Sequence, residues 1–146
     1  MSQRVLIVED EALIALDLSC CLEAMGHEVV AMAVDSEEAL AVAPQGVDLA
    51  LVDLNLRDGP TGPALGETLA RKWGATVIYL TANPNQVTPE ISGPVGILPK
   101  PFTDKALTQA IGFAVSLREG GSAAPPSELR LLAGAAVQGV QREACL

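Results

Sequence analysis

Residues 4–11 read RVLIVEDE, an aliphatic run that ends abruptly in three acidic residues. A short run rich in Val, Ile and Leu predicts a strand that is buried on both faces. Similar runs recur along the chain, and polar or charged residues follow most of them. We therefore expect five strands, at residues 4–8, 27–33, 47–52, 75–80 and 95–98.

The segments between these strands carry apolar residues at spacings of three and four, which is the period of an amphipathic helix. They predict helices at residues 11–25, 37–43, 64–73 and 103–118. Residues 82–94 contain Pro84, Pro89 and Pro94, which leave room for only a short or distorted helix. With it, five helices alternate with five strands. This order indicates an α/β fold, with right-handed crossovers, an open parallel sheet and helices on both faces.

The composition limits both the size of the domain and its partners. With 146 residues the chain can build one domain with a core, and its formal charge of −9 would repel nucleic-acid phosphates and anionic lipids. Its three cysteines lack the spacing of a metal site, which indicates reduced thiols. The N-terminal segment is interrupted by acids and is typical of neither a signal peptide nor a membrane span. We expect a cytoplasmic protein that binds neither nucleic acid nor membranes.

The composition changes near the C-terminus. Residues 119–126, EGGSAAPP, are typical of a flexible linker. A weak apolar stripe follows, at Leu129, Leu132, Ala136 and Val140. We expect a folded domain at residues 1–119, and at residues 120–146 a flexible linker with a short C-terminal helix as one alternative. Docking on the domain, dimerisation and folding on a partner stay open for this tail, and disorder is the default expectation.

The ends of the predicted strands carry the charged and reactive side chains. In open parallel sheets, ligands bind outside the carboxyl ends of the strands. Five side chains are expected at that edge: Glu9, Asp10, Asp53, Thr81 and Lys100. Each alone has a structural explanation, such as a helix N-terminus, a turn or a solvated loop charge. Together they crowd three carboxylates at one edge, and their mutual repulsion calls for cations.

Two cations can relieve this repulsion, namely Lys100 and a divalent metal. Oxygen ligands without a nearby His or Cys favour Mg²⁺. Phosphoryl transfer to a carboxylate is then the expected chemistry. Asp53 would attack, Mg²⁺ would neutralise the phosphoryl oxygens, and Lys100 and Thr81 would bind the transferred group.

The chain resembles the receiver domains of two-component response regulators across residues 3–118. The resemblance is carried by VLIVEDE, LALVDLNLRDGPTG, VIYLTAN and ILPKPF, in the family's order and spacing. It implies a flavodoxin-like sheet with strand order 2-1-3-4-5. It also implies a single-domain response regulator that receives a phosphoryl group from a histidine kinase or phosphotransfer protein. Because the tail is short for an output domain, the expected output is binding to a downstream protein, and a homodimer stays open.

The resemblance also assigns roles to individual residues. Asp53 would be the phosphoacceptor, and Asp10 would bind Mg²⁺ directly. Glu9 would act on the metal mostly through a bound water, and Asp53 and the backbone carbonyl of Asn55 would complete the protein's ligands.

The remaining assignments concern the phosphoryl group and its lifetime. Thr81 and Lys100 would each bind a phosphoryl oxygen, and Pro101 resembles the family's usual cis-proline junction. Asn55 and Asn83 occupy the positions that tune self-dephosphorylation in this family.

Two features depart from the family's usual pattern. Receivers usually carry Tyr or Phe three residues before the lysine, and here that residue is Ile97. The proline-interrupted segment 83–94 is the second departure. Both features are similar to those of an atypical, mostly alphaproteobacterial group of receivers, and they concern the switch rather than the chemistry.

Two other functions compete with a signalling receiver. A Mg²⁺-dependent phosphatase with an aspartyl-phosphate intermediate usually has a second acid two residues after its nucleophile, but Asn55 stands there. A pseudo-receiver would keep the shape without phosphorylation, and the complete set of five site residues argues against it. We therefore expect no enzyme activity beyond self-dephosphorylation.

Overall fold

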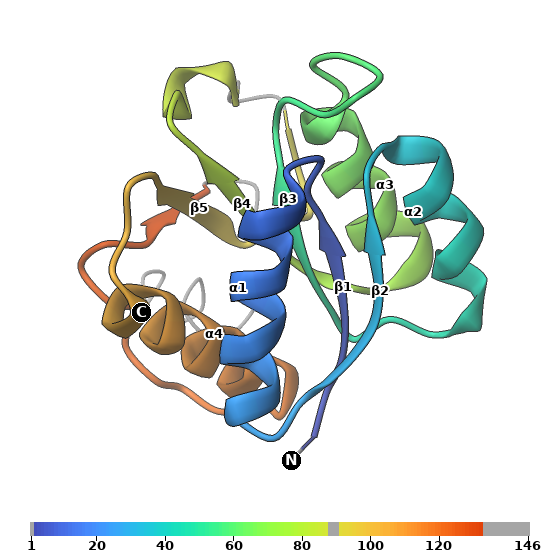
Figure 1. Ribbon diagram of the computed structural model, residues 1–146. Helices are drawn as coiled ribbons and strands as arrows, with labels where there is room; N and C mark the ends of the chain where they lie inside the picture. Colours follow the sequence, from blue (N-terminus) through green and yellow to red (C-terminus); the bar gives the residue numbers. More distant parts are fainter. Residues whose placement is uncertain (1, 88–90, 133–146) are drawn as a thin grey trace.

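The computed structural model describes residues 2–87 and 91–132, which form one six-stranded sheet flanked by helices (Figure 1). The strands are β1 (Arg4–Val8), β2 (Glu28–Ala33), β3 (Leu49–Asp53), β4 (Thr76–Thr81), β5 (Gly96–Pro99) and β6 (Arg130–Leu131). Their order in the sheet is β2-β1-β3-β4-β5-β6. Neighbouring strands from β2 to β5 are parallel, and β6 is antiparallel to β5. The predicted α/β class and the order 2-1-3-4-5 are confirmed.

Four α-helices of the described residues cover the sheet: α1 (Ala12–Ala24), α2 (Ser36–Val42), α3 (Gly62–Trp73) and α4 (Asp104–Arg118). Helices α1 and α4 lie on one face, and α2 and α3 lie on the other (Figure 1). Asp35 begins α2 by accepting a hydrogen bond from the Glu38 N–H, and Thr103 begins α4 in the same way. No helix in the described part of the chain is long and apolar enough to cross a membrane.

The alternation of side chains along the strands creates two hydrophobic cores. Val5 and Ile7 of β1 pack with α1 and α4, whereas Leu6 and Val8 pack with α2 and α3. Successive side chains of a strand point to opposite faces, so a strand between two helical layers must be apolar throughout. The uninterrupted aliphatic runs of the sequence therefore identify the central strands.

The segment between β4 and β5 contains little helix. Its prolines were expected to allow only a short or distorted helix at residues 82–94, and the described part contains a single 3₁₀ turn, η2 (Pro84–Gln86). Residues 88–90 lie outside the described residues. Pro84 suits the first position of such a turn because it lacks an N–H. A second 3₁₀ turn, η1 (Ala43–Gln45), follows α2 at Pro44.

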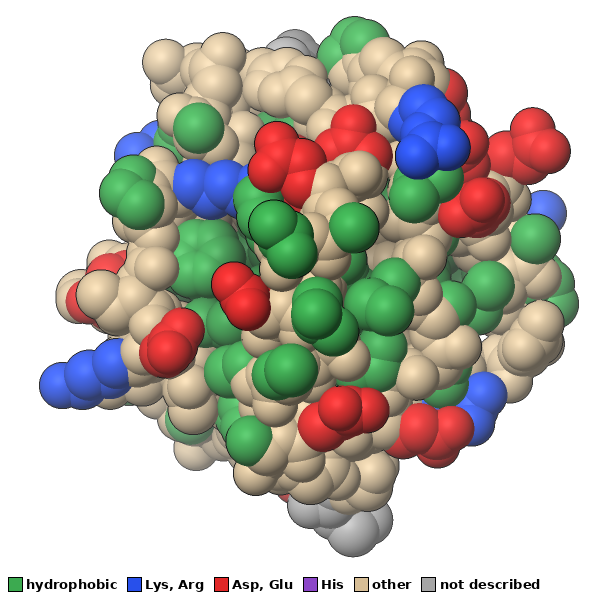
Figure 2. Space-filling view, viewed as in Figure 1, with side chains coloured by type: hydrophobic (Ala, Val, Ile, Leu, Met, Phe, Trp, Pro, Cys, Tyr) green, Lys and Arg blue, Asp and Glu red, His purple; other side chains and the backbone are tan. Residues whose placement is uncertain are grey.

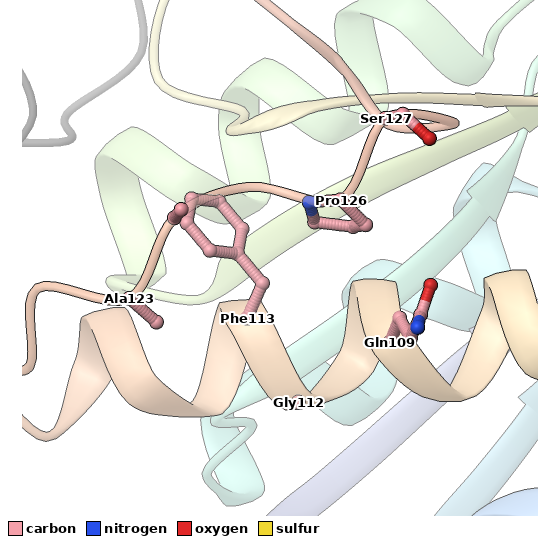
Figure 3. A pocket seen from close by; sticks show the side chains of 7 residues that line it. Gln109, Gly112, Phe113, Ala123, Pro126 and Ser127 are labelled. Atoms are coloured by element: carbon pink, nitrogen blue, oxygen red, sulfur yellow. The ribbon is translucent and has the colours of Figure 1, made fainter.

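A sixth strand, absent from the sequence prediction, comes from the C-terminal tail. Residues 119–128 run back past α4, where Phe113 and Pro126 contribute to a pocket of about 450 Å³ (Figure 3). Leu129 is then buried in the core of α1 and α4, and β6 pairs with the edge of β5. The helix considered for this segment does not form at residues 129–132. The rest of the apolar stripe, Ala136 and Val140, lies outside the described residues.

Gly96 explains how β6 approaches so closely. A Cβ at this position would lie 2.7 Å from the carbonyl oxygen of Arg130, which is closer than side chains come to backbone. The neighbouring residue of β5, Ile97, is buried and pairs with Arg130 across the two strands. The position where receivers usually carry an aromatic residue is therefore covered in this chain by its own tail.

Candidate functional site

The parallel register brings the ends of four strands to one edge of the sheet. Val8 pairs with Val52, Asp53 pairs with Leu80, and Thr81 pairs with Pro99. The residues that follow β1 and β5 therefore emerge at the same edge of the sheet as the end of β3, with β4 between β3 and β5. This edge is the location that the sequence predicts for the site.

Three carboxylates converge there. Glu9, Asp10 and Asp53 each offer an oxygen, and these oxygens lie within 4.8 Å of one another. The side chain of Glu9 is only 1% exposed and that of Asp53 is 12% exposed. Glu9 also accepts a hydrogen bond of 3.1 Å from the backbone N–H of Glu11, which fixes its carboxylate at the start of α1. The cluster is thus both acidic and largely shielded from water.

Lys100 forms ion pairs with two of these carboxylates. Its Nζ lies 3.2 Å from Asp53 Oδ2 and 3.3 Å from Glu9 Oε1. The peptide bond between Lys100 and Pro101 is cis, as the sequence predicts. Partial burial disfavours the charged amine, but the two carboxylates outweigh it and raise the pKa of Lys100 above its ordinary value.

Burial shifts the pKa of Glu9 in the direction opposite to its effect on Lys100, because it disfavours the charged form of each group. Removal from water raises the pKa of Glu9 to about 7, and the nearby charge of Asp53 adds to the effect. The hydrogen bond from Glu11 and the charge of Lys100 oppose the shift. One lysine therefore does not neutralise the cluster. A further cation fits the site, and a set of carboxylate oxygens suits a hard divalent metal ion.

Thr81 lies at the same edge but uses its hydroxyl elsewhere. It is buried, and its Oγ1 accepts a hydrogen bond of 2.9 Å from the backbone N–H of Asn83. The backbone of Thr81 reaches the site residues instead, since its carbonyl accepts from the Lys100 N–H at 2.7 Å. Among the described residues, the Thr81 hydroxyl makes no hydrogen bond to the carboxylate of Asp53.

Asn55 contacts the carboxylate of Asp53 through its backbone. Its N–H donates to Asp53 Oδ1 at 3.2 Å. Its side chain turns to η2 and forms two hydrogen bonds of 3.0 Å with the amide of Gln86, one in each direction. The sequence alone does not identify Gln86 as part of the site, because no motif or period connects residues 55 and 86.

Gly62 is a second residue of the site that no sequence motif identifies. Helix α3 begins there, two residues earlier than predicted, and its N–H donates to the Leu54 carbonyl at 3.1 Å. A Cβ at position 62 would collide with the carbonyl oxygen of Asp53 and the Cα of Leu54. Only glycine allows α3 to begin directly against the backbone that carries Asp53.

The loop between Asn55 and Gly62 is ordered by Asp58. Its carboxylate accepts hydrogen bonds from the hydroxyl groups of Ser36 and Thr61, the latter at 2.6 Å, and from the Ser36 N–H at 3.3 Å. The bonds from Ser36 and Thr61 lower the pKa of Asp58. The loop beside the site is therefore tied to the start of α2.

Comparison with known proteins decides the family. The family model of the response regulator receiver domain matches residues 5–112, which run from the second residue of β1 past the end of β5 and include every residue of the carboxylate cluster. The chain belongs to the response regulator receiver domain family. Receiver domains carry Mg²⁺ on an acidic cluster, and Glu9, Asp10 and Asp53 form a cluster that could hold such an ion.

Two curated relatives and one solved structure resemble this receiver domain. It is 34% identical over 125 residues to the phyllosphere-induced regulator PhyR of Methylorubrum extorquens, covering 81% of this chain and 47% of that protein. It is 38% identical over 120 residues to the transcriptional regulatory protein PdtaR of Mycobacterium tuberculosis, covering 78% and 57% respectively. The receiver domain thus spans about half the length of these curated relatives.

The solved structure extends the likeness to the fold. The receiver domain of PhyR from Erythrobacter litoralis, determined in solution by NMR, superposes with a TM-score of 0.74 at 30% identity. The match covers 84% of this chain and 97% of that one. Receiver domains of this family act in two-component signalling, where they interact with histidine kinases and downstream partners.

Proposed function

We propose that this receiver domain accepts a phosphoryl group on Asp53 from a partner histidine kinase or phosphotransfer protein, and that it signals by binding a downstream protein in the cytoplasm. The observation that carries the proposal is the pair of contacts that Lys100 makes, to Asp53 and to Glu9. A lysine shared by two buried carboxylates marks the place where a phosphoryl group would gain a cationic partner.

The transfer is a displacement at phosphorus. A carboxylate oxygen of Asp53 forms a bond to phosphorus, and the bond from phosphorus to the donor's imidazole nitrogen breaks. The electron pair stays on that nitrogen, which takes up a proton from the solvent, so the donor histidine leaves as a neutral imidazole. Lys100 is already 3.2 Å from Asp53 Oδ2 and would move with little displacement onto a phosphoryl oxygen.

The metal would be held by Glu9, Asp10, Asp53 and the backbone carbonyl of Asn55. Mg²⁺ would supply positive charge that offsets the negative charge of the phosphoryl oxygens. The fit rests on the donor set, since the side-chain ligands are carboxylate oxygens that lie within 4.8 Å of one another.

Thr81 supplies the switch in this proposal. Its hydroxyl is held by the Asn83 N–H, so binding a phosphoryl oxygen requires the hydroxyl to turn toward Asp53. That movement would change the backbone after β4 and pass to the end of β5, because the N–H of Lys100, the residue after β5, bonds the Thr81 carbonyl. The chemistry at Asp53 is thereby coupled to the sheet edge covered by the tail.

The surface beside Lys100 supports docking of a protein donor. Leu13 and Leu16 of α1 are 79% and 52% exposed, and hydrophobic side chains gather over α1 on the face shown in Figure 2. Next to them, Ile14, Lys100 and Phe102 contribute to a mostly apolar pocket of about 410 Å³. An apolar surface beside the acceptor suits a helical partner that carries phosphohistidine.

The competing function is a phosphatase that turns over through the same aspartyl phosphate. Asn55 cannot serve as the acid or base of such an enzyme, and its amide is engaged with Gln86. One experiment separates the two functions: incubation with acetyl phosphate and MgCl₂, and in parallel with p-nitrophenyl phosphate. We expect labelling of at most one group per chain and no turnover of the ester. Repeated turnover of the ester without a labelled chain would overturn the proposal.

A further inference from the structure

The amides of Asn55 and Gln86 form a reciprocal pair beside the acceptor. Asn55 Nδ2 donates to Gln86 Oε1, and Gln86 Nε2 donates to Asn55 Oδ1, both at 3.0 Å. Each amide uses one donor and its acceptor on the other, which is the most complete pairing that two side-chain amides can make. We refer to this pair as the amide clasp.

The clasp joins the two connections that leave the sheet on either side of Asp53. Asn55 follows β3, and its N–H also bonds Asp53 Oδ1 at 3.2 Å. Gln86 ends η2, the turn that follows β4 and begins shortly after Thr81. Since β3 and β4 are adjacent in the sheet, the clasp bridges the two loops at the edge where the phosphoryl group would sit.

Among the described residues, these two hydrogen bonds are the side-chain hydrogen bonds that join η2 to the loop after β3, and Val87, which follows η2, packs against the core that contains Leu54 and Leu56. Pro84 begins the turn without an N–H to donate, and Val87 N–H bonds the Pro84 carbonyl within the turn itself at 3.3 Å. Asn85, between them, is exposed and makes no hydrogen bond within the described part of the chain. Gln86 therefore supplies the hydrogen-bonded link between η2 and the loop that follows Asp53.

We propose that the amide clasp protects the phosphoryl group on Asp53 from water, so that Gln86 is a positioning residue that sets the lifetime of the phosphorylated state. The inference rests on the proposed function. In hydrolysis, a water oxygen forms a bond to phosphorus and the bond from phosphorus to the Asp53 oxygen breaks. The electron pair returns to the carboxylate, and the water's proton leaves with the phosphate or the solvent.

The clasp opposes this reaction in two ways. It holds two loops together and restricts the path by which water reaches phosphorus from the side of Asn55. It also occupies the Asn55 amide, which would otherwise be free to hold an attacking water. Opening the clasp before hydrolysis costs the free energy of its hydrogen bonds, and that cost slows the decay of the aspartyl phosphate.

The test follows the decay of the phosphorylated chain after the donor is removed. The chain is labelled with acetyl phosphate and MgCl₂, desalted, and sampled over time by intact-mass spectrometry. We expect Gln86→Ala to raise the first-order decay constant about 2- to 10-fold, as loss of one net hydrogen-bond free energy implies. The labelling rate should stay close to wild type, because the side-chain hydrogen bonds of Gln86 go to Asn55 and not to Lys100 or the carboxylate cluster.

Three further variants make the result specific. Gln86→Met keeps the length of the side chain but cannot form the clasp, so it should decay as fast as Gln86→Ala. Asn85→Ala, in the same turn, should decay like wild type. In an Asn55→Ala background, Gln86→Ala should add no further acceleration, because the clasp is already lost.

The outcomes separate this inference from the proposed function. If the chain labels but Gln86→Ala decays at or below the wild-type rate, the clasp does not protect the phosphoryl group. If Gln86→Met decays like wild type while Gln86→Ala is fast, bulk rather than the clasp is responsible, and the inference is also overturned. If neither protein labels at all, the proposed function fails together with the inference.

Discussion

Lys100 Nζ lies 3.2 Å from Asp53 Oδ2, although 47 positions separate the two residues in the sequence. The same amine lies 3.3 Å from Glu9 Oε1, 91 positions away. Because the carboxylates are buried, this amine is their principal source of positive charge among the described side chains. It connects the ends of β1, β3 and β5 at one point.

Replacing Lys100 should weaken the metal-free protein. Lys100→Met leaves Glu9 and Asp53 buried without their cationic partner, and we expect the free energy of unfolding to fall by about 1–3 kcal/mol. Urea denaturation in EDTA measures this change. Lys105→Met is the matched control, since Lys105 is exposed on α4 and its loss should change stability by less than about 0.5 kcal/mol. Equal stability of both variants would contradict the ion pairs.

Two glycine substitutions should change the free energy of unfolding in opposite directions. Gly62→Ala places a methyl group against the carbonyl of Asp53 and the Cα of Leu54, so it should cost about 1–3 kcal/mol. Gly112→Ala lies on the exposed side of α4 with open space around it, and it should gain about 0.5–1 kcal/mol. Thermal and urea unfolding of both variants test the pair. A destabilised Gly112→Ala, or a neutral Gly62→Ala, would refute the packing described for these helices.

The tail strand should contribute measurable stability. Leu129 is buried against the core of α1 and α4, so Leu129→Ala should destabilise the protein by about 2–3 kcal/mol. The neighbouring Glu128 is exposed, and Glu128→Ala should be nearly neutral. If both substitutions are neutral in urea denaturation, the tail does not pack on the receiver domain as described.

His27 should make stability depend on pH. Its Nδ1 accepts a hydrogen bond of 3.1 Å from the Gln3 N–H, and partial burial lowers the pKa of His27 below 6.5. The unfolded chain therefore binds a proton at higher pH than the folded chain does. The contribution of His27 is fully present above pH 6.5 and is lost as the pH falls from 6.5 through the folded pKa.

His27→Asn isolates this effect, because Asn keeps an acceptor near the Gln3 N–H without titrating. Glu9 titrates in the same range in both proteins, with a raised pKa, so its contribution cancels in the difference. We expect the stability difference between wild type and variant to become less favourable to wild type as the pH falls below 6.5. A stability difference that stays constant between pH 5 and 8 would show that folding does not change the pKa of His27.

The sequence predicts which charged side chains come together when they stand directly at the ends of predicted strands. Glu9, Asp10, Asp53 and Lys100 each follow a strand whose aliphatic run is visible in the sequence, and the parallel register then brings them together. The direction of the Thr81 hydroxyl is not predictable in this way, because it depends on a local bond to the Asn83 N–H.

The features that the sequence does not reveal each depend on one close contact between two segments that are distant in the sequence. Strand β6 has two residues, too few for an alternating pattern, and it forms because Gly96 leaves room for the Arg130 carbonyl. Gln86 lies in a proline-containing segment without period, so its pairing with Asn55 requires the relative positions of two loops. Residue propensities and hydrophobic patterns predict individual helices and strands, whereas these contacts form between different parts of the fold.

The central claim is that Asp53 is the phosphoacceptor of the carboxylate cluster. The most direct measurement is peptide mapping by mass spectrometry after incubation with acetyl phosphate, with MgCl₂ or with EDTA. We expect the label on the peptide that contains Asp53, its loss in EDTA and in a folded Asp53→Asn variant, and its retention in Asp17→Asn. A label on another residue, or equal labelling of Asp53→Asn, would contradict the account.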